Sequence, residues 1–324
     1  MARGGDGPFA GFAAGTLNTI DTGRLGVVMF FLISGFVVPF SIKGDRPVRR
    51  FVISRLFRLY PAYWVSLVAV TILLTLTGHV PSFLQVLANG SMAATVLGQE
   101  WMNGVYWTLF IELLFYGMTV VLFVLGVLYQ PILLAGVAGL LALTTDLAII
   151  APDLPSPVQY IGLHLSVMFS GLLLRLGLVE GKRSALFMAG LLFVFQMLSV
   201  VVASDYALQT ERGFAAFSMT STILAYVLGF GVFLAVAVFG RKDTRFLAHM
   251  AAVSYSFYLL HSEINAAVFH FLPLTGQWSD LIALSVSVAV AIGVASVIYR
   301  LVEQPFMALG RRIAVASRPV AVPG

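Results

Sequence analysis

Apolar runs of about 20 residues recur along almost the whole chain, the length that crosses a bilayer as an α-helix. Of the 324 residues, 60% are hydrophobic and 10% are charged, whereas a soluble domain is nearer half apolar and a quarter charged. Such a pattern leaves few alternatives for the fold. The sequence predicts an all-α fold, a polytopic integral membrane helical bundle.

The apolar runs define nine expected spans, roughly at residues 25–42, 60–78, 105–127, 131–150, 158–178, 185–203, 215–239, 247–271 and 279–301. Of the 19 Lys and Arg residues, 16 fall on one side of the membrane in this arrangement, and the exceptions are Arg3, Arg24 and Arg212. Because Lys and Arg near span ends stay cytoplasmic, the amino terminus is predicted outside and the carboxyl terminus inside. We treat residues 1–324 as a single transmembrane domain, with an extracytoplasmic arm at 1–24 and a flexible cytoplasmic tail at 311–324.

The net charge of +5 reflects cations in the short loops between spans. Membrane topology and anionic lipid head groups account for them, so no nucleic-acid partner is expected. The sequence contains no cysteine, which excludes disulfides, thiolate metal sites and a cysteine nucleophile. We nominate no metal ligands.

Polar groups inside spans are costly and need a partner, a water-filled cavity or a function. Glu112 lies about two turns below the outer end of its span, and it either joins helices through a neighbouring side chain or takes part in the chemistry. His261 is the deep histidine that we nominate. Its spacing places Ser254, Tyr258 and His261 on one helix face. Its imidazole either makes a helix–helix hydrogen bond or moves protons near neutral pH.

Other polar positions are weaker candidates. His164 and Asp146 are lone polar groups in apolar spans, for which structural pairing is the favoured interpretation. Glu263 is nearer the outer surface, where solvation explains it. Asn89 begins an Asn-Gly-Ser glycosylation sequon, a pattern that also occurs often by chance.

The basic stretch SRLFRLYP carries an R-x-x-R pair, Arg55 and Arg58. On a helix, this spacing puts both guanidinium groups on one side, and guanidinium forks suit phosphate oxygens. A basic loop that faces lipid would look similar. Pro61 suggests a helix break, and Tyr60, with Tyr63 and Trp64, is able to line the path of a ligand at the interface.

No soluble-enzyme motif is present, since the sequence lacks a Walker loop, G-x-G-x-x-G, H-E-x-x-H and G-x-S-x-G. Instead, five stretches in order resemble the membrane-bound acyltransferase-3 family. They are GVVMFFLISGFVVP, FVISRLFRLYPAYW, VYWTLFIELLFY, SYSFYLLHSE and YRLVEQP, and together they cover Leu25 to Pro305. This family contains O-acyltransferases that modify bacterial surface polysaccharides, lipopolysaccharide and some antibiotics.

The resemblance implies transfer of an acyl group, usually acetyl, from acyl-CoA to a hydroxyl of a cell-surface sugar or glycolipid at the bacterial inner membrane. Acyl-CoA would be a cosubstrate, and no tightly bound cofactor is expected. By position, Arg55 and Arg58 match the family pair thought to engage the coenzyme. Glu112 matches its conserved acidic position, and His261 matches the histidine that closes the S-Y-x-x-Y-L-x-H segment.

One departure from the family pattern concerns the first span. The resemblance implies about ten spans, and the first carries a basic residue and an essential histidine. Here no span precedes Leu25, and the first histidine is His79. We therefore expect a chain that lacks this helix and is incomplete as an enzyme.

The leading hypothesis is acyl transfer through the helix bundle. Coenzyme A phosphates would bind Arg55 and Arg58 beside Tyr60, and His261 would act as base with Glu112 as its orienter. Tyr258 or Ser254 would hydrogen-bond the oxyanion or the sugar. The alternatives are a proton-coupled transporter or flippase that uses the carboxylates and histidines of other spans, and a catalytically inactive membrane scaffold.

Overall fold

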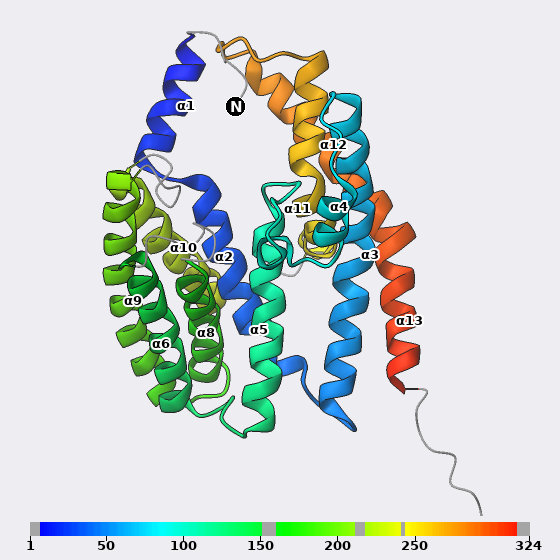
Figure 1. The fold of residues 1–324 in the computed structure, drawn as a ribbon. Coiled ribbons are helices and arrows are strands. Elements are labelled where there is room, and N and C mark those ends of the chain that lie inside the picture. The colour runs from blue at the N-terminus through cyan, green and yellow to red at the C-terminus, as the bar shows by residue number, and fades with distance from the viewer. Residues whose placement is uncertain (1–6, 151–159, 211–217, 241–243, 316–324) are drawn as a thin grey trace, which may run out of the picture. The chain divides into compact units, whose positions relative to one another are not determined.

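A computed structural model describes residues 7–150, 160–210, 218–240 and 244–315, and these residues form helices without any strand. Figure 1 shows their order along the chain. The helices are α1 (Pro8–Thr19), α2 (Thr22–Val37), η1 (Pro39–Ser41), α3 (Pro47–Leu76), α4 (Phe83–Gly90), η2 (Ala94–Leu97), α5 (Tyr106–Val124), α6 (Pro131–Ile150), α8 (Ile161–Leu178), α9 (Arg183–Thr210), α10 (Met219–Phe239), α11 (Arg245–Phe271), α12 (Asp280–Ile298), η3 (Tyr299–Glu303) and α13 (Gln304–Val315).

Within the described ranges, eight helical stretches are long and apolar enough to cross a membrane. The protein is therefore a polytopic helical membrane protein, as the sequence predicts. The expected span at 247–271 also forms a helix, α11, which is 27 residues long. It is not among the eight stretches, because polar side chains such as His249, His261 and Glu263 interrupt its apolar character.

The chain divides into two compact units. Unit 1 comprises Met1–Gly11, Ile42–Tyr106 and Lys242–Gly324, and unit 2 comprises Phe12–Ser41 and Trp107–Arg241. The predicted arm at 1–24 contains helix α1 and the start of α2. The predicted tail at 311–324 is helical as far as Val315, and residues 1–6 and 316–324 lie outside the described residues.

Helix α3 corrects the prediction of a basic loop at 43–59 and a break at Pro61. It begins at Pro47 and passes through Pro61 to Leu76, so Arg55 and Arg58 are helical. Proline removes one amide donor from the helix, but membrane helices tolerate this where neighbours satisfy the backbone. Two residues before Pro61, the Leu59 carbonyl accepts a hydrogen bond of 2.8 Å from the hydroxyl of Tyr255.

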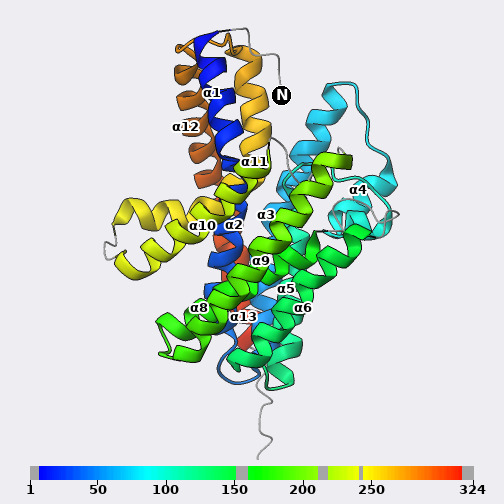
Figure 2. The same cartoon turned by 90° about the vertical axis from the view of Figure 1, so that its left-hand side faces the viewer.

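Helix α8 forms the core of unit 2, where 15 of its 18 residues are buried. It packs against α2, α6 and α9, and Figure 2 shows α6, α8 and α9 close together. Glycines permit the tightest of these contacts. A methyl group added at Gly35 of α2 would lie 1.7 Å from the Met168 carbonyl oxygen, and one added at Gly171 of α8 would lie 2.2 Å from the Leu32 carbonyl oxygen.

Polar side chains join the helices of unit 2 in the apolar interior. The amide of Gln196 on α9 donates to the hydroxyls of Ser166 (2.7 Å) and Ser170 (3.0 Å) on α8. Ser199 on α9 donates to Asp146 on α6 at 2.9 Å. Interhelical hydrogen bonds of this kind hold membrane helices together, so Asp146 has the structural partner that its favoured interpretation requires.

In unit 1, α11 and α12 pack side by side (Figures 1 and 2). His249 of α11 contacts the Ser296 hydroxyl of α12 at 3.0 Å, and Ser287 donates to Asn265 at 2.5 Å. Helix α13 packs against α3, where a methyl group added at the buried Gly310 would lie 2.7 Å from Phe57. These contacts bring α11, η3 and α13 around α3.

Asn89 of the glycosylation sequon is fully buried in unit 1. Its amide donates to the carbonyls of Gln85 (2.9 Å) and Glu100 (3.0 Å), and its oxygen accepts from the Met102 amide at 3.1 Å. The nitrogen that a glycan would modify is therefore enclosed by the protein. Asn89 instead stabilises the fold through these hydrogen bonds.

Replacing Asn89 with alanine is expected to lower the stability of unit 1 by about 1–3 kcal/mol, because three backbone groups lose the partner that this fully buried side chain provides. Thermal unfolding of the purified protein in detergent measures this loss. The control is Ser82→Ala, which removes only the exposed cap of α4. Equal stability of the two variants would contradict the structural role of Asn89.

Candidate functional site

Six of the seven predicted site residues lie in unit 1, on two helices that contact each other. Arg55, Arg58 and Tyr60 lie on α3, and Ser254, Tyr258 and His261 lie on α11. Two hydrogen bonds join these helices: Tyr255 donates to the Leu59 carbonyl at 2.8 Å, and Ser66 donates to the Leu259 carbonyl at 3.1 Å. Residue numbers increase in the same direction along both helices at this contact, so α3 and α11 run roughly parallel.

The arginine pair lies in the first half of α3. The guanidinium of Arg55 is 5.5 Å from the centre of the Phe51 ring, and the side chain is partly buried. Arg58, three residues further along the helix, is exposed. Because α3 is helical here, the two arginines, three residues apart, lie on the same side of the helix, as the sequence predicts.

Tyr60 and Trp64 line an apolar groove between α3 and α13. The groove has a volume of ≈ 390 Å³ and is lined by Leu56, Phe57, Tyr60, Pro61, Trp64 and Phe306. The polar atoms of its two largest aromatic side chains bind elsewhere: Tyr60 donates to the Ser91 carbonyl (3.2 Å) and Trp64 to the Gly90 carbonyl (3.1 Å). Tyr63 is fully buried, and its hydroxyl donates to the Asn89 carbonyl at 2.6 Å.

His261 is held by a backbone carbonyl of its own helix. Its Nδ1 lies 2.8 Å from the Tyr258 carbonyl oxygen, which can only accept, so Nδ1 carries the proton. Nε2 is then the nitrogen that can receive a proton. The ring is partly exposed and stacks on Phe257, with the ring centres 6.0 Å apart.

The face of α11 that carries Ser254, Tyr258 and His261 is only partly enclosed. Tyr258 donates a long hydrogen bond of 3.4 Å to the Val105 carbonyl. Ser254 is exposed, and its hydroxyl donates to the Ala251 carbonyl of the same helix at 2.9 Å. The buried polar groups of α11 are instead Tyr255 and Ser256, on the face that contacts α3 and η3.

Glu263, further along α11, is partly buried and was not among the predicted site residues. Its Oε1 accepts a hydrogen bond of 2.6 Å from Asn103, which also donates to the Leu259 carbonyl at 3.4 Å. Its Oε2 is buried and has no hydrogen-bond partner among the residues that the structure describes. The interpretation that Glu263 is simply solvated is therefore wrong, because the loop before α5 covers it.

Glu303 is the second carboxylate that sequence analysis missed in unit 1. It is 2% exposed and accepts a hydrogen bond from the fully buried Ser256. The signal was present in the stretch YRLVEQP, where a lone acidic residue follows a long apolar run.

Glu112 lies in unit 2 and is 5% exposed. Tyr116, one turn further along α5, donates to its Oε1 at 2.6 Å, and Ser34 of α2 donates to the same oxygen at 3.5 Å. The carboxylate thus joins α2 and α5 within this unit. Its predicted role as the orienter of His261 stays a prediction.

His164 is more fully buried than His261, at 5% exposure. Its ring lies against Phe31 (5.4 Å between ring centres) and Trp107 (5.1 Å). Its Nδ1 lies 2.6 Å from the Tyr160 carbonyl. Aromatic packing from α2 and α5 explains how α8 accommodates this polar ring.

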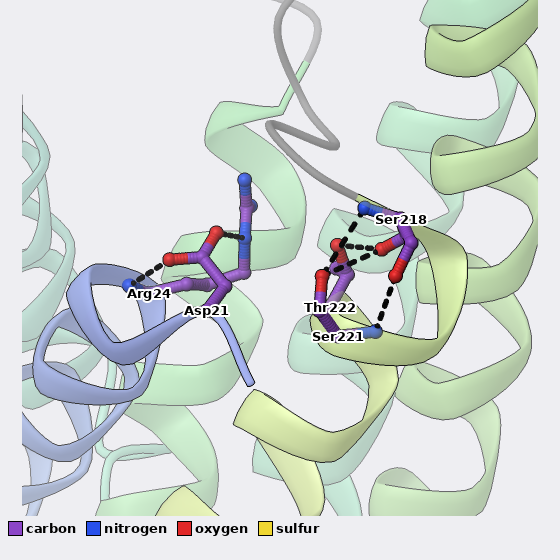
Figure 3. A network of polar contacts seen from close by, with 5 residues as sticks. All are labelled: Asp21, Arg24, Ser218, Ser221 and Thr222. Carbon is purple, nitrogen blue, oxygen red and sulfur yellow. Dashed lines mark hydrogen bonds and ion pairs between the residues drawn. The ribbon is translucent and has the colours of Figure 1, made fainter. Parts of the chain in front are cut away.

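Arg24, an exception to the predicted charge distribution, is paired locally. Figure 3 shows its guanidinium beside Asp21, with Nε 3.2 Å from Oδ2 and side-chain exposures of 14% and 10%. Asp21 also caps α2 by accepting from the Arg24 amide at 2.9 Å. At the start of α10, Ser218 and Ser221 form a capping box, and the Asp21 amide donates to the Ser221 carbonyl at 3.3 Å. Pairing with Asp21 explains a cation on the sparsely charged side.

Comparison with known proteins agrees with this architecture. The acyltransferase domain that defines the acyltransferase-3 family matches residues 4–300, so the chain belongs to this family. It is therefore a multi-pass helical membrane protein of a family of acyltransferases. It is also 30% identical over 112 residues to Nodulation protein 10 of Rhizobium leguminosarum bv. viciae, a match that covers 28% of this chain and spans only 30% of that relative. No solved structure matches significantly.

Proposed function

We propose that the protein transfers an acyl group, acetyl in the simplest case, from acyl-CoA to a hydroxyl of a cell-surface sugar or glycolipid. The observation that carries this proposal is the packing of α3, with its arginine pair, directly against α11, with its histidine. A donor site and a proton acceptor on contacting helices of one unit are what such a transfer needs. The expected setting is a bacterial inner membrane, with the amino terminus outside and the carboxyl terminus cytoplasmic.

The donor binds through its phosphates to Arg55 and Arg58 from the cytoplasmic side. Guanidinium forks bind phosphate in two parallel hydrogen bonds, and the basic residues before α3 add attraction for an anion. Arg55 and His261 are separated by about 15 Å of helical rise along the parallel pair. A phosphopantetheine arm, extended beside Tyr60, is of comparable length and brings the thioester towards α11.

In the transfer step, the acceptor hydroxyl oxygen attacks the thioester carbonyl carbon. The new C–O bond forms and the C–S bond breaks, and coenzyme A leaves as a thiolate. Nε2 of His261 takes the hydroxyl proton and returns it to the thiolate. Tyr258 and Ser254 are the proposed hydrogen-bond donors to the oxyanion or the sugar.

The donor assignment is tested by binding and turnover of labelled acetyl-CoA by the purified protein in lipid nanodiscs. We expect Arg55→Ala/Arg58→Ala to weaken binding at least roughly tenfold, because two charge-assisted contacts are lost. Arg183→Ala is the matched control, since this exposed arginine begins α9 in unit 2. Unchanged binding by the double variant, or an equal loss in the control, would overturn the donor site.

The transporter alternative receives no comparable support. Its candidate residues Glu112, Asp146 and His164 all lie in unit 2. Glu112 binds α2 and Asp146 binds α9, whereas His164 packs against Phe31 of α2 and Trp107 of α5. These contacts between helices favour the structural interpretation of Asp146 and His164.

A further inference from the structure

The groove between α3 and α13 is open at the surface of unit 1 and apolar along its lining. Leu56, Trp64 and Phe306 are 39%, 51% and 42% exposed. The polar atoms of Tyr60 and Trp64 bind backbone carbonyls, so the groove offers a ligand an apolar surface. An empty recess forfeits dispersion contacts, and an apolar one excludes water. In a membrane, a hydrocarbon chain is therefore the occupant that fits it.

A row of side chains along α3 joins this groove to an arginine at the start of the helix. Arg49, Ile53, Leu56, Tyr60 and Trp64 follow one another at intervals of four, three, four and four residues. Residues with this spacing share one face of a helix. The groove therefore has a cation at one end of the same face.

The arginine of the proposed donor site that is partly buried lies on another face of α3. Arg55 precedes Leu59 by four residues, and the Leu59 carbonyl accepts from Tyr255 of α11. Arg55 thus shares the face that contacts α11, whereas Arg49 shares the face that lines the groove.

Helix α13 encloses Arg49 at this end of the groove. Its Nη2 donates a hydrogen bond of 3.4 Å to the Ile313 carbonyl, and Gly310 packs against Phe57. The two helices are therefore antiparallel, and Figure 1 shows the start of α3 and the end of α13 at the same end of unit 1. Nη1 of Arg49 is buried and has no hydrogen-bond partner among the residues that the structure describes. Because such a donor is costly to leave unpaired, an anion that accepts from it is favoured.

Cations outnumber acidic residues around Arg49. The segment before and at the start of α3 contains Lys43, Arg46, Arg49 and Arg50 against Asp45, and α13 adds the exposed Arg311 and Arg312. The first turn of α3 contains no acidic residue, and the amino-terminal end of a helix attracts negative charge. Basic clusters of this kind beside membrane helices recognise anionic lipid head groups.

We propose that the groove and Arg49 form a binding site for an anionic glycerophospholipid. One acyl chain lies along Leu56, Tyr60 and Trp64, and the phosphate accepts a hydrogen bond from Nη1 of Arg49. Leu56 lies about 10 Å of helical rise beyond Arg49, and the head-group region of one leaflet is about 5–8 Å thick. A phosphate at Arg49 therefore leaves the groove at the depth of the acyl chains. This site goes beyond the proposed function and does not depend on it.

The test is titration of the purified protein in detergent with dioleoylphosphatidylglycerol, followed by native mass spectrometry, which counts the bound lipids. Dioleoylphosphatidylcholine has the same chains and no net charge, and we expect it to bind about fivefold more weakly or worse. Arg49→Gln is expected to weaken phosphatidylglycerol binding about fivefold and to reduce this selectivity. Arg183→Gln, at the exposed start of α9, is the matched control. Unchanged binding by Arg49→Gln, or equal binding of the two lipids, overturns the proposal.

A second variant tests the groove itself. Leu56→Trp adds bulk to the lining while Arg49 stays in place, so we expect phosphatidylglycerol to bind about fivefold more weakly or worse. Leu140→Trp on α6, at a position that is 65% exposed, is the control and is expected to bind as the parent protein does. Equal binding by both tryptophan variants overturns the assignment of the acyl chain.

Glycerol 3-phosphate provides a test that needs no variant, because it carries the phosphate without the chains. We expect it not to displace phosphatidylglycerol. Displacement at equal concentration would indicate a site for a free phosphate ester and would overturn the lipid assignment.

Two other occupants of the groove give distinct results, and each would overturn the proposal. Displacement of phosphatidylglycerol by acetyl-CoA would assign the groove to the donor. A dimer that Leu56→Trp converts to a monomer would assign it to a second copy of the chain. The proposed transfer fails separately, since its tests use Arg55, Arg58 and His261, none of which lines the groove.

Discussion

Replacing His261 with glutamine is expected to lower kcat for acyl transfer by about 10²–10⁴-fold, the usual contribution of a general base. The Tyr258 carbonyl holds the proton on Nδ1 at 2.8 Å and leaves Nε2 to receive the hydroxyl proton. Glutamine retains a donor for the Tyr258 carbonyl but has no basic nitrogen. Donor binding, which the proposal assigns to α3, is expected to stay unchanged.

The measurement is transfer of labelled acetyl groups into the membrane and polysaccharide fractions of cells that express the protein, together with acetyl-CoA binding by the purified variant. His270→Gln is the matched control, because this exposed histidine lies at the end of the same helix. Full transfer by His261→Gln would remove it as the base. Loss of both transfer and binding would assign it to the donor site instead.

Replacing Gly35 with alanine is expected to disrupt the packing of unit 2. The added methyl group would lie 1.7 Å from the Met168 carbonyl oxygen, far inside van der Waals contact, so α2 and α8 must separate. Overpacking in a close-packed interior costs about 1–3 kcal/mol and occasionally more, and here the obstacle is backbone that cannot rotate away. Gly171→Ala, which meets the Leu32 carbonyl oxygen at 2.2 Å, is expected to act in the same direction.

Thermal unfolding in detergent and the yield of monodisperse protein measure this effect. Gly136→Ala on α6 is the control, because a methyl group there has no neighbour within 4 Å. Alanine in a helix is favoured over glycine by about 1 kcal/mol, so the control is expected to be as stable as the parent protein or slightly more stable. A Gly35→Ala variant with the same unfolding midpoint as Gly136→Ala would refute close packing of α2 on α8.

Hydropathy predicted the membrane helices well where side chains are uniformly apolar. The expected span at 131–150 coincides with α6, Pro131–Ile150. The predicted start of α3 is wrong, because charged residues and Pro61 resemble a loop in the sequence, whereas the helix already begins at Pro47. A hydropathy profile does not show that the Tyr255 hydroxyl of another helix donates a hydrogen bond to the Leu59 carbonyl, two residues before this proline.

The candidate site shows a similar limit. Spacing along α3 and α11 identified Arg55, Arg58 and His261 as candidates, and the two helices are in contact. Spacing does not reveal which neighbour covers a helix face. Glu263 is partly covered by Asn103 from a preceding loop, and Glu303 is buried in a π-helical turn, although neither position stands out in a periodic pattern.

The burial of α8 has a consequence for biogenesis. This helix has the lowest mean hydropathy of the eight membrane-crossing stretches, and it carries His164, Ser166 and Ser170 among its buried residues. Polar residues weaken the partitioning of a nascent segment from the translocon into lipid. Partners such as Gln196, which follows on α9, satisfy these groups. Stable integration of α8 is therefore expected to await synthesis of α9, so that the two segments leave the translocon as a pair.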